Sequence, residues 1–314
     1  MEHRLLGLHN HTSHSDGRQS FSQLLQKARS EMVTDLVVTD HESVGFMAEF
    51  SDPEIKKLVQ GINIYPGTEL EFEHDDILGD TLVYGGDLNK LSSFLPVLDP
   101  VFKKKLHLEK IERFHYGYTK LGFKLPSVEE LLEFQSKSTQ MPIMTILGGL
   151  AQYKEFNDNR FKEFGAIERH RKAELQRQYI TSKGAKYEIP SKFAKPTLDE
   201  LHIASKAVGG KLFFAHPNLL EPKKRSIVYE HAKKNKIFDG IEVYYPGTSD
   251  ADLKATHEYA IKNNLLISGG TDSHTMEESI GMVQLAKIKR FRKVGNIYQA
   301  SESEFKWLDE IERL

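Results

Sequence analysis

Six short runs of apolar, β-branched and aromatic residues recur along the chain, and most of them end in polar side chains. Each run has the length of a strand, and its apolar residues occupy both faces. Such runs are typical of strands buried on both sides in a parallel sheet. The runs cover residues 4–11, 35–41, 62–69, 211–217, 240–247 and 265–274.

Helical patterns separate these runs. Residues 20–32 begin with Ser20, a predicted helix cap, and carry apolar positions at helical spacing. Residues 197–208 open with the capping-box pair Thr197 and Glu200 and end at Gly209, while residues 250–264 form a third helical pattern. Alternating strands and helices predict an α/β fold of mostly parallel strands.

The middle of the chain differs from both ends. Between residues 94 and 196 the strand signals fade, and long charged amphipathic helices dominate, as at 101–122 and 161–180. We expect an α/β body from 1–93 and 197–314, with 94–196 as a helical insertion covering one end of it. The Lys and Arg residues of this segment alternate with Tyr and Phe, which suits either a grip on a phosphate-bearing substrate or an ordinary solvated helix face.

Charge and cysteine content exclude several classes of protein. The formal net charge of the 314 residues is −2, which gives no overall electrostatic attraction for long duplex nucleic acid. The chain contains no cysteine, so disulfides, thiolate metal ligands and a cysteine nucleophile are excluded. No secretory signal or long apolar segment is visible, and we therefore expect a cytoplasmic protein without a membrane partner.

Histidine and carboxylate side chains gather at the ends of the predicted strands. Six of the 14 histidines lie there or just beyond, including His14. The carboxyl ends of parallel strands meet at one mouth of such a fold, so these side chains are expected to converge. The candidate ligands are His9, His11, Asp16, His41, Glu69, His216, Asp272 and His274.

Imidazoles and carboxylates without thiolates suit zinc, manganese or iron. Eight ligands exceed the need of one ion, so we expect two or three divalent ions, with Glu69 or Asp272 bridging two of them. A single histidine at a strand end is more often structural than a ligand. The repetition of the pattern in TDH, AHP and TDSH favours a metal centre, although His14 is the least secure candidate.

The motifs in this order resemble the PHP (polymerase and histidinol phosphatase) family, and within it the stand-alone metal-dependent phosphoesterases. The matching segments are LHNHTSHSDG, VVTDHES, YPGTELEFE, LFFAHP and SGGTDSH, which span most of the chain. The resemblance implies a distorted seven-stranded (β/α) barrel with a helical insertion near a polynuclear metal centre. It also implies phosphate-ester hydrolysis, with the eight candidates as metal ligands.

Two positions depart from the family pattern. Leu82 stands where the family usually has a histidine, and Gly148 and Gly149 stand where it has Arg-Pro-His. The centre is therefore expected to hold two ions if the third position has lost its imidazoles. His74, His115 or His170 are open alternatives for compensation.

The predicted mechanism uses a metal-activated water that attacks phosphorus in line with the leaving oxygen. His216 or His274 is predicted to protonate that oxygen. Arg18 either contacts phosphate or is an exposed side chain. Asp40 either orients a ligand from outside the metal shell or caps the following helix.

The substrate classes that fit the resemblance are phosphomonoesters, nucleotides and short oligonucleotides, with histidinol phosphate as a further candidate. Phe114, Tyr116 and Tyr118 either stack on a base or pack in a helix core. Two rival functions are a metal-bound accessory module without catalysis and an amidohydrolase-like enzyme that cleaves C–N bonds. The sequence leaves the oligomeric state open.

Overall fold

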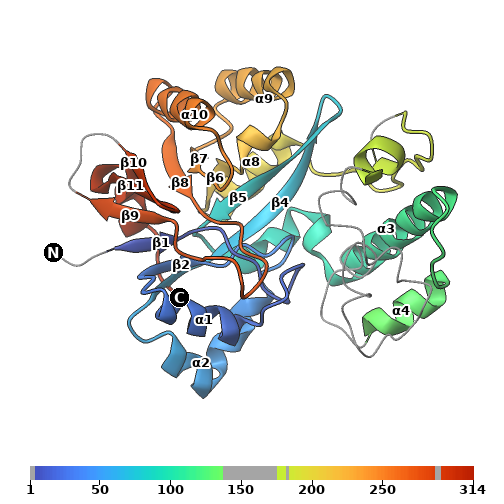
Figure 1. Ribbon diagram of the computed structural model, residues 1–314, viewed down its shortest axis with the longest axis horizontal. Helices are drawn as coiled ribbons and strands as arrows, with labels where there is room; N and C mark the ends of the chain where they lie inside the picture. Colours follow the sequence, from blue (N-terminus) through green and yellow to red (C-terminus); the bar gives the residue numbers. More distant parts are fainter. Residues whose placement is uncertain (1–3, 137–174, 182–183, 287–290) are drawn as a thin grey trace. The chain divides into compact units, whose positions relative to one another are not determined.

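The computed structural model describes residues 4–136, 175–181, 184–286 and 291–314 of the chain (Figure 1). Its strands form one sheet of six and one of five. The first sheet has the order β10-β11-β9-β1-β2-β3, with β1 (Leu5–Gly7), β2 (Asp35–Val37), β3 (Asn63–Tyr65), β9 (Val283–Ala286), β10 (Arg292–Val294) and β11 (Ile297–Ser301). The second has the order β4-β5-β6-β7-β8, with β4 (Gly67–His74), β5 (Ile77–Tyr84), β6 (Lys211–Phe214), β7 (Gly240–Tyr244) and β8 (Leu266–Gly269).

All six predicted strand runs contain strands, which confirms the α/β class, but both sheets are mixed. Strands β1, β2 and β3 pair in parallel, as do β6, β7 and β8. Strands β4, β5 and β6 are antiparallel neighbours, and β9 runs antiparallel to β1. The expectation of mostly parallel strands is therefore only partly right. It missed the β4–β5 hairpin, whose turn residues Asp75 and Asp76 both have positive φ.

The three predicted helices form, two of them with the predicted caps. In α1 (Phe21–Ser30) and α8 (Leu198–Ala207), the side chains of Ser20 and Thr197 accept the backbone N–H of Gln23 and Glu200 in capping boxes. Ser249 caps α10 (Asp250–Lys262). The other α-helices are α2 (Pro53–Leu58), α3 (Pro100–Lys120), α4 (Val128–Ser136) and α9 (Pro222–Asn235). Short 3-10 segments occupy Gly45–Ser51, Leu88–Ser93, Pro96–Leu98, Pro217–Leu219 and Glu302–Glu310, with a π turn at Arg177–Thr181.

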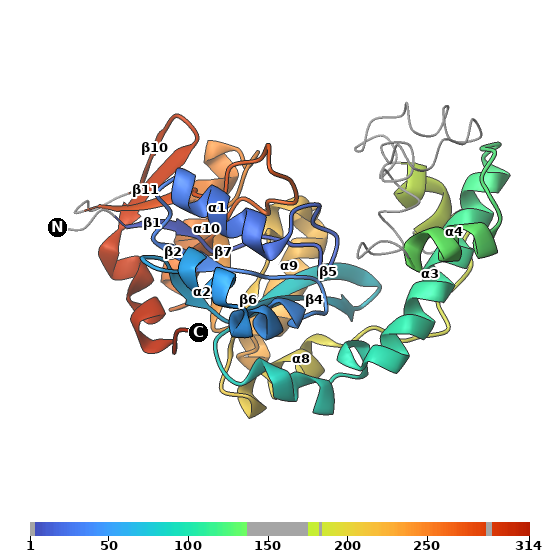
Figure 2. The same ribbon diagram turned by 90° about the horizontal axis from the view of Figure 1, so that it is seen from below.

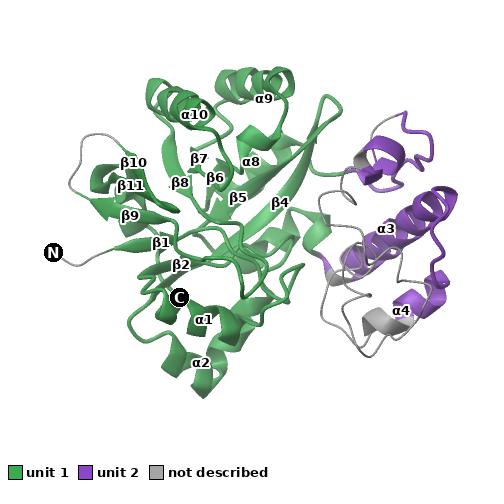
Figure 3. Ribbon diagram, viewed as in Figure 1, with its two compact units in different colours: residues 1–98, 195–314 green, residues 99–194 purple. Residues whose placement is uncertain are grey.

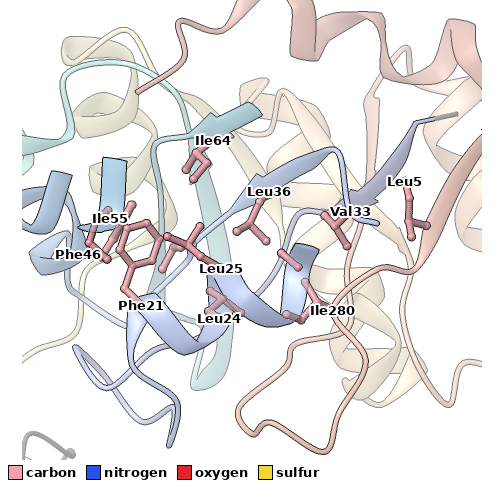
Figure 4. Packing of buried hydrophobic residues seen from close by; sticks show 12 residues of the cluster. Leu5, Phe21, Leu24, Leu25, Val33, Leu36, Phe46, Ile55, Ile64 and Ile280 are labelled. Atoms are coloured by element: carbon pink, nitrogen blue, oxygen red, sulfur yellow. The ribbon is translucent and has the colours of Figure 1, made fainter. Parts of the chain in front are cut away.

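Helix α1 packs its apolar face on the first sheet (Figure 4). Leu25 of α1 lies beside Leu36 of β2, and Phe21 meets Phe46 and Ile55 from the segment that follows β2. Each fully buried side chain of this size contributes about 1.5–3 kcal/mol through removal of apolar surface from water. This packing anchors the loops that leave the carboxyl ends of β1 and β2. Figure 2 shows α1 and α2 beside these strands in a second view.

The chain divides into two compact units, of residues 1–98 with 195–314 and of residues 99–194 (Figure 3). Phe114 and Tyr118 lie in the core of the second unit with Ile111 and Leu131, so they pack in a helix core and are not available to stack on a base. Tyr116 is exposed, with the Lys120 ammonium over its ring. That the 94–196 segment covers the mouth of the site stays a prediction.

Two isolated parallel bridges link the two sheets. One pairs Asn10, after β1, with Ser273, after β8, and the other pairs His41, after β2, with Glu69 of β4. Each bridge is adjacent to predicted ligands, so the loops that carry them are held together by backbone pairing. Among the described residues, no helix is long and apolar enough to cross a membrane.

Candidate metal centre

The structure brings all eight predicted ligands together at the carboxyl ends of the strands. The loop after β1 carries His9, His11 and Asp16, and the loop after β2 carries His41. Glu69 lies within β4, while the residues after β6 and β8 supply the rest. Seven of the eight, all but His216, form three overlapping groups together with Asp80 within the described part of the chain, and each group is compact enough to hold a metal ion.

The first group is His9, His11, Glu69 and Asp272. Glu69 Oε2 lies 3.1 Å from Nε2 of both His9 and His11, and His11 Nε2 lies 2.9 Å from Asp272 Oδ1. His9, His11 and Glu69 are almost fully buried. The spacing of His9 and His11 therefore places two imidazoles at one carboxylate, as the alternation of side chains along an extended chain predicts.

The second group is His11, Asp16, His41 and His274. Asp16 Oδ2 lies 3.1 Å from His274 Nε2, and Asp16 Oδ1 lies 3.6 Å from His11 Nδ1. The rings of His11 and His274 stack at 4.2 Å. The Ser-Asp-Gly turn thus returns Asp16 to the histidine of its own loop.

The third group is His41, Glu69 and Asp80, with His216 beside it. His216 Nε2 lies 2.9 Å from Glu69 Oε1 and 3.9 Å from Asp80 Oδ2. Asp80 was missed in the sequence, although it lies two residues from Leu82 in β5 and so shares its face of the strand. Leu82 itself is buried and pairs with Glu69 in register.

The proposed compensating histidines do not join these groups where they are described. His74 contacts Asp75 and the ring of His231, and His115 lies 2.7 Å from the carbonyl oxygen of Pro126. Gly148, Gly149 and His170 lie outside the described residues. In the described part of the chain, Asp80 is the residue that joins His41 and Glu69 in the third group.

Unusual backbone conformations aim two of these side chains. His216 and Asp272 both have positive φ, of 26° and 54°, a region that non-glycine residues rarely adopt. Such strain persists where surrounding contacts fix it, and it is common at functional sites. Gly270 serves the same end, because a Cβ there would lie 2.4 Å from the Cβ of His9.

The close pairing of imidazoles and carboxylates shifts their pKa values. Burial lowers the pKa of His41, but the charges of Glu69 and Asp16 outweigh it and raise the pKa to about 9. Burial and the charge of Glu69 raise the pKa of Asp80 to about 7. Burial opposes ionisation of Glu69, yet the surrounding imidazoles hold its pKa well below the usual range. Protons and cations would therefore compete for the same atoms.

The donor atoms of this centre are better arranged to bind metal ions than to hydrogen-bond to one another. His11 Nε2 and Asp272 Oδ1 are buried without a hydrogen bond of acceptable geometry, although they lie 2.9 Å apart. Buried polar atoms are nearly always hydrogen-bonded, so such orphans require an explanation. Lone pairs that converge from several strands without hydrogen-bond geometry are what a cation needs.

The other predicted site residues lie at the edge of these groups. Asp40 accepts hydrogen bonds from Thr12 N at 2.7 Å and from Ser15 Oγ at 2.6 Å, so it holds the turn between His11 and Asp16 and caps no helix. Arg18 is exposed, and its backbone N–H donates to His274 O at 2.7 Å. Its contact with phosphate stays a prediction.

His14 pairs with a partner outside the three groups. Its Nε2 contacts a carboxylate oxygen of Glu49, and both side chains are about one-third exposed. The doubt about His14 was justified, because it lies apart from the other strand-end histidines.

Two further residues contact the predicted ligands and were not singled out in the sequence. Glu242, in the middle of β7, faces His9 Nδ1, and Tyr245 donates its hydroxyl to Asp272 Oδ2 at 3.0 Å. Both lie in the run GIEVYYPG, which ends without a histidine or an aspartate. Period-two alternation along this run would have placed Glu242 on the face opposite to Ile241 and Val243. It gives no signal for Tyr245, which follows an irregularity of the strand between Glu242 and Tyr244.

No protein-family model matches the chain, and no curated protein matches it by sequence. A solved structure from Bifidobacterium adolescentis, assigned by inference as a metal-dependent phosphoesterase, matches with a TM-score of 0.64 at 19% identity. The match covers 99% of this chain and 98% of that one. An amidohydrolase from Chromobacterium violaceum, with bound sulfate and no metal, matches with a TM-score of 0.61 at 18% identity, over 86% and 87% of the two chains. The chain thus shares the fold of a structure assigned to the metal-dependent phosphoesterases, the class that the sequence motifs resemble.

Proposed function

We propose that the protein is a metal-dependent hydrolase of phosphate esters. The observation that carries the proposal is the overlap of the three ligand groups, which share His11, His41 and Glu69 between neighbouring positions. Overlapping ligand groups are the arrangement that places metal ions a few ångströms apart, as two-metal phosphatase chemistry requires.

We further infer that the two sheets close into the distorted seven-stranded barrel implied by the family resemblance. The bridges Asn10–Ser273 and His41–Glu69 join strands that belong to different sheets, and both lie at the ligand-bearing ends. Closure there supports a site at the mouth of a barrel.

Two or three divalent ions, of manganese, zinc or iron, are proposed to occupy the groups, with Asp80 serving the third. When bound, they would supply a hydroxide at neutral pH and neutralise the phosphoryl oxygens. The residues of the protein position one another. Glu69 Oε2 contacts Nε2 of His9 and of His11, and Glu69 Oε1 contacts Nε2 of His216. Asp40 keeps the turn before Asp16 in place. Protonation of the leaving oxygen by His216 or His274 stays a prediction, because the Nε2 of each faces a carboxylate.

The proposed substrate is a phosphorylated small molecule, a nucleotide or a short oligonucleotide. A histidinol-phosphatase-like monoesterase is the alternative within this class, and a non-catalytic metal-bound module is the alternative outside it. The retention of eight ligands at one mouth favours an enzyme, since a decayed centre would not need them. Neither long duplex nucleic acid nor a membrane is an expected partner.

Metal content and phosphate release, measured on a panel of nucleotides and sugar phosphates with added Mn²⁺, test the proposal. We expect turnover by the wild type, and we expect His9→Ala and Asp272→Ala to lose both bound metal and activity. His14→Ala is the matched control, because this histidine of the same loop lies outside the three groups and should leave both unchanged. Fully metallated protein that hydrolyses no phosphate ester would contradict the proposal. Hydrolysis of an amide panel instead would favour the C–N hydrolase.

A further inference from the structure

We propose that Glu242 is a positioning residue that fixes the tautomer of His9, so that His9 turns Nε2 toward the first ligand group. This inference rests on the metal centre of the proposed function and assigns a role to a residue outside the three groups. Glu242 lies in β7, and its side chain is fully buried. Its Oε1 is 3.1 Å from His9 Nδ1, and its Oε2 is 2.8 Å from the backbone N of His216.

A buried carboxylate needs donors, because burial of an uncompensated charge costs several kcal/mol. The backbone N–H of His216 can only donate, so it satisfies Oε2. The contact with Oε1 is satisfied only if His9 carries its proton on Nδ1. A neutral imidazole with Nδ1 protonated has its lone pair on Nε2.

That lone pair points to the place where the first group converges. His9 Nε2 lies 3.1 Å from Glu69 Oε2 and 3.4 Å from Asp272 Oδ1. The other tautomer would direct an N–H at this position and leave Glu242 facing an unprotonated nitrogen. Histidine ligands commonly have their remaining N–H held by a carboxylate in this way, which fixes the ring and strengthens the donor.

The same carboxylate also constrains the loop after β6. His216 has a φ of 26°, a strained value for a residue with a side chain, and Glu242 accepts the N–H of this residue. The imidazole of His216 then reaches Glu69 Oε1 at 2.9 Å. Glu242 therefore positions one ligand through its ring and another through its backbone.

His274 shows that the device is specific to His9 and is not shared by every histidine of the site. The Nδ1 of His274 lies 2.8 Å from the backbone carbonyl oxygen of Asp272, so its tautomer is fixed within its own loop. Substitution of Glu242 should therefore change His9 and leave the tautomer of His274 as it is.

The variant Glu242→Gln tests this role with almost no change of shape. A glutamine can keep the N–H of His216 on its oxygen, and its amide then donates to His9 Nδ1 and moves the ring proton to Nε2. We expect the Kd for Zn²⁺ or Mn²⁺ at one position to rise about 10–100-fold, as for other partners of metal-bound histidines. Nitrogen-15 NMR of the Zn²⁺-loaded and metal-free proteins should show Nδ1–H on His9 in the wild type and its loss in the variant.

Glu304→Gln is the matched control. Glu304 also contacts a histidine, His257 at 3.2 Å, and accepts a hydrogen bond from the hydroxyl of Tyr244, which lies on β7 with Glu242. This substitution should leave metal affinity and the His9 spectrum unchanged.

A folded Glu242→Gln variant with wild-type metal affinity would overturn the inference. So would the absence of Nδ1–H on His9 in the wild type, a result that needs no variant to fold. Phosphate release by the wild type decides the proposed function separately. A wild type that binds no metal would contradict the proposed function, while its metal-free spectrum would still show whether Nδ1 of His9 carries a proton.

Discussion

Charged side chains are buried near both ends of strands β1, β2 and β3, but the partners of these side chains differ. At the amino ends, Asp35 receives a two-pronged ion pair from Arg4, at 2.8 and 3.1 Å, and further hydrogen bonds from Thr34, Asn63 and Tyr65. At the carboxyl ends, Glu69 is surrounded by imidazoles instead of a full cation. There, His11 Nε2 and Asp272 Oδ1 approach each other without a hydrogen bond.

The comparison indicates that the charge of Asp35 stabilises the fold, whereas the charge of Glu69 is placed to bind a metal ion. Asp35 has a permanent cation and enough donors for both oxygens, so it completes its own site. The carboxylates of the metal centre have imidazole partners, which are neutral or charged according to pH. Two residues of this centre, His216 and Asp272, have strained backbone conformations. A site of this kind gives up folding stability in exchange for binding. The comparison predicts that substitutions at the two ends separate stability from metal binding.

The largest effect is expected for Glu69→Gln. Glu69 contributes to two of the three ligand groups, so its loss should abolish tight metal binding and reduce phosphate release by about a thousandfold or more. The free energy of unfolding of the metal-free protein should change less than for the Asp35 variant below, because one of several crowded carboxylates is removed. Calorimetric metal titration and urea unfolding measure the two quantities. Tight metal binding by a folded Glu69→Gln variant would remove Glu69 from the centre.

Asp35→Asn is the converse change. Removal of the Asp35 charge weakens a half-buried, two-pronged ion pair and leaves Arg4 with the exposed Asp309 as its remaining carboxylate partner, so it should lower the free energy of unfolding by about 1–3 kcal/mol. The Kd for metal should stay as in the wild type. Glu54→Gln, which breaks an exposed pair with Lys57, is the control and should cost less than about 0.5 kcal/mol. A weaker metal affinity in Asp35→Asn would show that the two ends are coupled.

The same comparison explains how far the sequence predicts the site. The eight candidate ligands were predicted because polar residues follow apolar strands, and the structure places them close together. Asp80 was missed because it lies on β5, an antiparallel strand whose hairpin turn, Asp75–Asp76, lacks the Asn-Gly or Gly-Gly signal of such turns. Glu242 was missed because a carboxylate within an apolar strand gives no motif. Its partners His9 and His216 lie after β1 and after β6, and their proximity depends on the order of strands in the sheets.

Removal of metal should affect only variants with an intact centre. A ligand that binds the folded state alone stabilises it by about 2.7 kcal/mol at a free concentration of 100 times Kd. Addition of EDTA to metal-loaded wild type should therefore lower Tm, and Asp35→Asn should show the same shift from its lower starting value. Glu69→Gln should show almost none. An equal shift in all three proteins would place the metal outside the proposed centre.

The smallest effect is the acid dependence of the Asp35 contribution. Burial opposes the ionisation of Asp35, but the hydrogen bonds from Arg4 and Thr34 outweigh it and lower the pKa below its usual range. The unfolded state, with a pKa of about 3.9, then binds more protons than the folded state as the pH falls. The stabilisation by Asp35 is therefore complete above about pH 5 and is lost progressively as the pH drops through the folded pKa. Urea unfolding in EDTA should show a gap between wild type and Asp35→Asn that narrows below pH 4, since the carboxylates of the metal centre are common to both proteins and cancel in the difference. A gap that stays constant from pH 6 to pH 3 would mean that the folded protein leaves the pKa of Asp35 unchanged.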